Sequence, residues 1–238
     1  MTAKLFERFG NFPQNFETRC KSFKIESYYK HQYIIVFYDN IISMSWNKVM
    51  HNKNEVLSAT RQFIKYIQTQ WNTQIKGWML NTVGEYKSHA FNEMLCNEGI
   101  HIYQSAPHTP QQNSRAERHI HTLMDKAQVM CLHTCLPPSY WEFAVNQAVH
   151  IHNRVSSQCL NWKMPMEFLT GQKPDISHLH TFGCCAYVHL SQEQHGRKLQ
   201  PKSQLMIHIS RCCTYKQCQY DFHEAGQLSL HPITCHLQ

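Results

Sequence analysis

The residues best suited to chemistry lie between Ala106 and Leu123, a segment that reads APHTPQQNSRAERHIHTL. Its acid is Glu117, which follows a polar, proline-marked segment expected to form a loop and stands near Arg115 and Arg118. A carboxylate beside arginines suits a site where a metal ion, an acid and a phosphate meet. A glutamate near a helix N-terminus is also stabilised by the helix dipole, so Glu117 alone leaves both interpretations open.

Two further polar residues follow predicted buried strands. Asp39 ends the aromatic and β-branched run Tyr33 to Tyr38, and Asn81 ends the apolar run Ile75 to Leu80. Open α/β sheets bind ligands at the carboxyl ends of their strands, which makes both positions candidates for a site. The pair Asp39-Asn40 is equally typical of a simple turn.

Longer motifs connect these residues. They are YIIVFYDN (33–40), IKGWMLNTVGEY (75–86), TPQQN (109–113), AER (116–118), LPPSYWEFAVNQAVHIHNRV (136–155), TGQKPDISHLHTFGCCAYVHL (170–190) and KLQPKS (198–203). In order and spacing they resemble the integrase of copia-type retrotransposons. The resemblance runs through nearly the whole chain, and it is specific because several independent motifs match.

The resemblance implies a catalytic triad made of Asp39, residue 81 and Glu117. It also implies that Asp39 and Glu117 are ligands of Mg²⁺ or Mn²⁺ in a two-metal site. Where the family has its second aspartate, this chain has Asn81, and thirty-five residues separate it from Glu117, as in the family. Magnesium prefers anionic oxygens, and an amide offers a neutral one. We therefore expect weak binding of the second metal and impaired catalysis.

The same resemblance implies that the segment before Glu117 faces a DNA end. Hydrogen bonds to the DNA are expected from Gln111, Gln112 and Asn113, and phosphate contacts from Arg115 and Arg118. For Arg118 an ordinary solvated position is an equal alternative. DNA is thus the expected partner, together with further copies of the chain, since integrases act as multimers.

The elements that must position these residues indicate an α/β fold. The resemblance implies an RNase H-like integrase core, a mixed sheet flanked by helices, followed by a small β module that is incomplete in this chain. We expect an N-terminal remnant without a zinc module at 1–30, the core at 31–160, a linker at 161–180 and the β-rich module at 181–238. Trp162 and Phe168 are expected to anchor the linker by packing.

Within the core the pattern predicts a strand over 43–50, a helix over 53–71, a short helix over 88–99 and a strand over 100–104. An apolar stripe predicts that the Glu117 helix buries Ile120, Leu123, Ala127 and Met130. A following helix is expected to bury Trp141, Ala144, Val145 and Ala148. Short β-type runs are predicted at 186–190, 205–209, 218–222 and 231–236.

Composition narrows the location and the cofactors. The chain has 238 residues, 42% of them hydrophobic, and a net charge of +7, which is compatible with a polyanionic partner. It shows neither a membrane-length apolar run nor a secretory signal, so we expect no membrane association and no secretion. The substrate implies a nuclear location, with the cytoplasm as the alternative. The spacing of the eleven cysteines and eighteen histidines does not match a zinc site, so no zinc is expected.

The sequence therefore favours a retrotransposon integrase core that binds DNA. Its ancestral activity would be 3′-end processing and strand transfer, and Asn81 predicts that this copy is a pseudoenzyme. Two alternatives stay open. One is a non-enzymatic module, co-opted to bind nucleic acid or a protein. The other is a decayed element without a selected role.

Overall fold

The computed structural model describes residues 15–80, 89–104, 110–189, 202–214 and 217–224. Its centre is a five-stranded sheet in the order β3-β2-β1-β4-β5. The strands are β1 (Asn15–Ser22), β2 (Tyr33–Asp39), β3 (Ser45–Met50), β4 (Gly77–Leu80) and β5 (His101–Gln104). β1 is antiparallel to β2 and parallel to β4, so the sheet is mixed, as the sequence predicted.

The strand β1 differs from the sequence prediction, which placed residues 1–30 in a remnant outside the core. β1 lies in the middle of the sheet and is hydrogen-bonded to strands on both sides, so the core includes Asn15–Ser22. The strand was missed because it alternates between apolar and charged positions rather than forming an apolar run. Phe16 is fully buried, while the neighbouring Glu17 and Arg19 carry charges.

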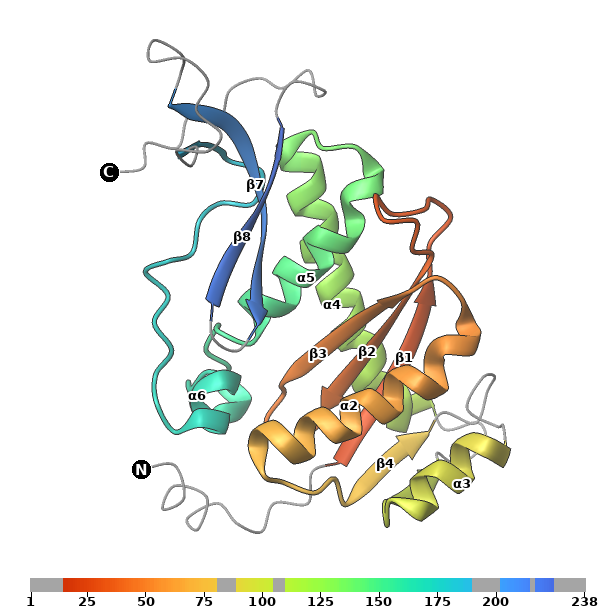
Figure 1. The fold of residues 1–238 in the computed structure, drawn as a ribbon. Helices are drawn as coiled ribbons and strands as arrows, with labels where there is room; N and C mark the ends of the chain where they lie inside the picture. Colours follow the sequence, from red (N-terminus) through yellow and green to blue (C-terminus); the bar gives the residue numbers. More distant parts are fainter. Residues whose placement is uncertain (1–14, 81–88, 105–109, 190–201, 215–216, 225–238) are drawn as a thin grey trace.

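Helices cover both faces of this sheet (Figure 1). On one face α2 (Val56–Trp71), preceded by the short helix η1 (Lys53–Glu55), packs on β1, β2 and β4 together with α3 (His89–Asn97). On the other face lie α4 (Pro110–Thr134) and α5 (Trp141–His152), which share a second hydrophobic cluster with Ile34 and Val36 of β2. The remaining helices that the structure describes are short. They are η3 (Pro138–Tyr140), η4 (Gln158–Leu160) and α6 (Pro165–Thr170).

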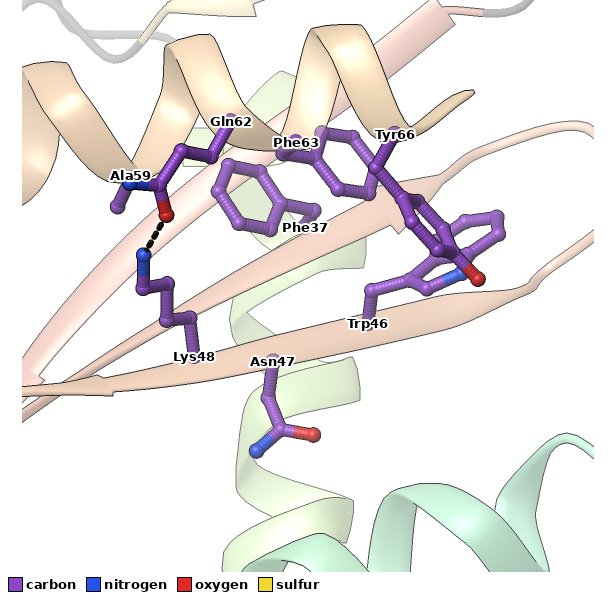
Figure 2. A pocket seen from close by; sticks show the side chains of 8 residues that line it. All are labelled: Phe37, Trp46, Asn47, Lys48, Ala59, Gln62, Phe63 and Tyr66. Atoms are coloured by element: carbon purple, nitrogen blue, oxygen red, sulfur yellow. Dashed lines mark hydrogen bonds between the residues drawn. The ribbon is translucent and has the colours of Figure 1, made fainter. Parts of the chain in front are cut away.

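Aromatic contacts between α2 and the sheet build the hydrophobic cluster on the α2 face. Phe63 of α2 stacks on Phe37 of β2 with ring centroids 4.0 Å apart, and Trp46 of β3 meets Phe63 at 5.5 Å. These rings, with Tyr66, line a recess of about 250 Å³ (Figure 2). At its rim Lys48 donates a hydrogen bond to Gln62. The recess lies on the α2 side of the sheet, opposite α4.

A small antiparallel sheet follows the core, with the order β6-β7-β8. Its strands are β6 (Cys185–His189), β7 (Ser203–Thr214) and β8 (Gln217–Glu224). Ile207 and Ile209 of β7 are fully buried in the same cluster as α4 and α5, so this sheet packs on the core. Three of the four predicted β runs coincide with these strands, and the fourth, 231–236, lies outside the described residues.

The predicted apolar stripes of α4 and α5 are confirmed. Ile120, Leu123 and Ala127 are buried, as are all four predicted residues of α5, while Met130 is partly buried against them. Two expectations were wrong. Trp162 is 70% exposed and anchors nothing by burial, and residues 110–113 belong to α4 rather than to a loop. Among the described residues, no helix combines the length and apolarity needed to cross a bilayer.

Gly183 gives a test of how the small sheet meets α4. It has φ +77, and a Cβ placed there would lie 2.3 Å from Cγ2 of Thr134, the last residue of α4. We expect Gly183→Ala to lower the free energy of unfolding by about 2–4 kcal/mol, from left-handed strain and overpacking together.

Gly99→Ala is the matched control for urea unfolding. Gly99 has φ +70, but nothing lies within 4 Å of its added Cβ, so only the strain of about 1–2 kcal/mol remains. Equal losses in the two variants would contradict the close contact between Gly183 and Thr134.

Candidate functional site

Glu117 lies well inside α4, which begins at Pro110. The stabilising effect of the helix dipole on an acid is confined to the first turn, so it does not explain this glutamate. Its carboxylate is 56% exposed and its Oε1 lies 2.8 Å from Nη2 of Arg19. Glu117 therefore faces the central strand β1 through an ion pair with Arg19.

Arg19 is less exposed than its partner. Its side chain is only 19% exposed, and its backbone sits in the strand that pairs with both β2 and β4. A second acid shares this face, since Glu17 precedes Arg19 by two residues and side chains two apart on a strand point the same way. Glu17 is 6% exposed and accepts a hydrogen bond from Nδ2 of Asn40 at 2.6 Å.

Asp39 has different partners. Its Oδ1 accepts hydrogen bonds from the backbone N–H groups of Ile41 and Ile42, at 2.8 and 3.2 Å. These are the bonds of the turn that the pair Asp39-Asn40 suggested. Its Oδ2 is buried and has no hydrogen-bond partner among the described residues. Burial raises the pKa of this carboxyl to about 6, against the lowering effect of the two backbone hydrogen bonds.

The pairing register separates Asp39 from Glu117. Asp39 is directly opposite Phe16 of β1, and directly opposed residues point to the same face of a sheet. Phe16 contacts Phe63 of α2, so Asp39 belongs to the α2 face. Tyr38, one residue earlier, stacks on His119 of α4, as expected for the opposite face. The structure thus brings Glu117 to Arg19 and not to Asp39.

A polar layer behind Glu117 also went unnoticed in the sequence. His119 is 9% exposed, stacks on Tyr38 with centroids 4.1 Å apart and shares a hydrogen bond with Oγ of Ser45. His152 of α5 meets it edge to face at 4.5 Å. Desolvation lowers the pKa of His119 to about 3, helped by His152 and by Lys126. Histidines at polar-looking positions of a helix carry no sequence signal that would reveal this contact.

The other predicted site residues are placed less fully. Asn81 lies outside the described residues, so its part in a triad with Asp39 and Glu117 stays a prediction. Gln111, Gln112, Asn113 and Arg115 belong to the first two turns of α4, and their side chains lie outside what is described. Arg118 is exposed on α4, next to Glu117.

The described residues do not fit a shared metal site. Asp39 and Glu117 lie on opposite faces of the sheet, and Glu117 already has a cation beside it. Within the described ranges, no group of three or more His, Cys, Asp or Glu side chains is arranged to hold a metal ion. The expected Mg²⁺ or Mn²⁺ site is therefore not formed by the side chains that the structure places.

Comparison with known protein sequences identifies the family of this chain. The chain is 32% identical over 184 residues, 77% of its length, to the retrovirus-related Pol polyprotein from transposon TNT 1-94 of Nicotiana tabacum. It is 27% identical over 84% of its length to the corresponding polyprotein from transposon RE2 of Arabidopsis thaliana. The chain belongs to the copia-type Pol polyprotein family. It spans 14% and 13% of these two relatives, and it matches no family model.

Solved structures of other proteins share the fold of this chain. The integrase catalytic core domain of HTLV-2, solved in complex with magnesium, matches with a TM-score of 0.50, covering 66% of this chain and 95% of that domain. The simian T-cell lymphotropic virus intasome, in complex with PP2A regulatory subunit B56 gamma, matches with a TM-score of 0.54 over 87% of this chain and 75% of the other. At 14% and 12% identity these likenesses show the fold, an RNase H-like integrase core.

The buried histidine gives this copia-type core a pH dependence that can be measured. Because the folded-state pKa of His119 is about 3 and the unfolded value is 6.5, the unfolded chain binds more protons between these values. Stability from this residue is therefore present above pH 6.5 and is lost as the pH falls below it. By pH 5 the loss from His119 is about 2 kcal/mol.

We expect His119→Gln to remove that part of the pH dependence in urea unfolding between pH 7.5 and pH 5. His121→Gln, an exposed histidine on the same helix, is the control and should retain the slope of the unchanged chain. If His119→Gln loses stability with falling pH as steeply as the unchanged chain does, His119 is not buried as a neutral base.

Proposed function

We propose that this copia-type core binds DNA and has little or no strand-transfer activity. The observation that carries the loss of activity is Asn81, an amide at the position where the resemblance requires the second catalytic aspartate. An amide removes one negative charge from a site that works through divalent cations. The Pol relatives and the integrase-core fold support the ancestral role in DNA integration.

DNA binding rests on different properties from catalysis. The net charge of +7 favours a polyanion, and phosphate contacts do not require a complete catalytic triad. A homo-oligomer and a nuclear location belong to the same proposal, because integration is a multimeric reaction on chromosomal DNA. The rival functions are a protein-interaction module and a decayed element without a selected role, and both predict weak DNA binding.

The activity is tested with labelled duplex oligonucleotides that carry retrotransposon-type ends, in Mg²⁺ and separately in Mn²⁺. We expect no joined product above the level given by Glu117→Gln. Glu117 is more than half exposed, so this variant should fold normally. Robust joining by the unchanged chain that Glu117→Gln abolishes would overturn the proposed loss of activity.

The binding part is tested through its salt dependence, without divalent metal. We expect affinity for duplex DNA to fall steeply as salt rises, and Arg118→Ala to reduce the slope of log K against log [salt] by about 1. Arg61→Ala is the control, because Arg61 is exposed on α2, across the sheet from α4. Absence of DNA binding even at low salt would contradict the proposal. Equal effects of Arg118→Ala and Arg61→Ala would show that α4 is not part of the DNA-binding surface.

A further inference from the structure

The ion pair between Arg19 and Glu117 places a protein cation on the carboxylate to which the resemblance assigns a metal ion. Nη2 of Arg19 lies 2.8 Å from Oε1 of Glu117, the distance of a charge-assisted hydrogen bond. The arginine is the less exposed partner and rises from the central strand of the sheet. The ion pair therefore connects the central strand β1 to α4.

A divalent cation and this guanidinium compete for the same oxygen. Mg²⁺ binds oxygen ligands at about 2.0–2.1 Å, so a metal on Oε1 would stand within a few ångströms of Arg19. Two positive charges that close repel each other, more strongly at a partly buried position than in bulk water. Glu17 shares the face of Arg19 and accepts a hydrogen bond from Asn40, so Glu117 is the acid that the structure pairs with the guanidinium.

We propose that Arg19 is a built-in counter-ion that closes the α4 face of this core to divalent metal ions. Glu117 then serves to hold the guanidinium rather than to bind metal. This deepens the proposed loss of activity, because it adds a second cause that is independent of Asn81. The role proposed for Arg19 concerns metal binding alone. Its test can therefore fail or succeed independently of the test of DNA binding.

The test is a titration of the full chain with MnCl₂, followed by calorimetry and by the electron paramagnetic resonance signal of free Mn²⁺. We expect the unchanged chain and Glu117→Gln to bind Mn²⁺ equally weakly. Arg19→Met should bind at least about tenfold more tightly, a change worth about 1.4 kcal/mol. The double variant Arg19→Met with Glu117→Gln should lose this gain.

Two controls separate the contact from overall charge and from unfolding. Lys21→Met removes the same charge from an exposed position on the same strand, and it should bind Mn²⁺ like the unchanged chain. Arg19→Lys retains the cation and should keep Mn²⁺ binding weak. Circular dichroism establishes that each variant is folded.

The proposal is overturned by any of three results. The first is Mn²⁺ binding by the unchanged chain that Glu117→Gln abolishes, which needs no change at Arg19. The second is an equal gain in Lys21→Met and Arg19→Met. The third is a folded Arg19→Met that binds Mn²⁺ no more tightly than the unchanged chain.

Discussion

The central position of β1 is the constraint on which the rest of this structure depends. A strand that is hydrogen-bonded on both edges shows its side chains only to the two faces of the sheet, in strict alternation. In β1 this alternation sends Phe16 to the aromatic cluster under α2 and Arg19 to Glu117 of α4. Every residue of this strand is thus committed to one of two environments, an apolar one and a polar one.

The polar environment requires compensation, because charges that are removed from water are stable only when they are paired or hydrogen-bonded. The described chain supplies a partner for Glu17 and for Arg19, which are the two less exposed charged groups of β1 on this face. Glu17 receives the amide of Asn40, and Arg19 receives the carboxylate of Glu117. His119 extends the layer in its neutral form, since burial disfavours its charged form and protonation would also add a cation close to His152 and Lys126.

The elements that could be predicted were those whose pattern is local. The helices α4 and α5 bury the stripes that their periodicity indicated, and α2, β2 and β3 form where a helix and two strands were predicted. β1 escaped because charged residues occupy one of its faces, which hides a strand from any search for apolar runs. The prediction that Trp162 anchors the linker by packing was wrong because it relied on the size of the apolar side chain alone. Trp162 lies in a turn with φ +64, where its side chain is exposed.

The candidate site was less predictable than the fold, because its contacts depend on register. Asp39 and Glu117 were grouped by resemblance, and nothing in the order of residues states which face of β2 an aspartate takes. A shift of one position along the strand moves a side chain to the other face of the sheet. Asp39 is opposite Phe16, on the α2 face, whereas Tyr38 meets α4. The alternation of Glu17 and Arg19 with other residues is visible in the sequence. It indicates a polar face only once β1 is known to be the central strand.

The two departures from a metal-dependent site point in the same chemical direction. Asn81 stands where the resemblance expects an aspartate, so a negative charge is absent. Arg19 places a positive charge on Glu117, so a negative charge is neutralised. Each change alone weakens the attraction that draws a dication to a cluster of acids. The integrase fold itself does not require these charges, because α2, α4 and α5 are held by the two hydrophobic clusters on the faces of the sheet.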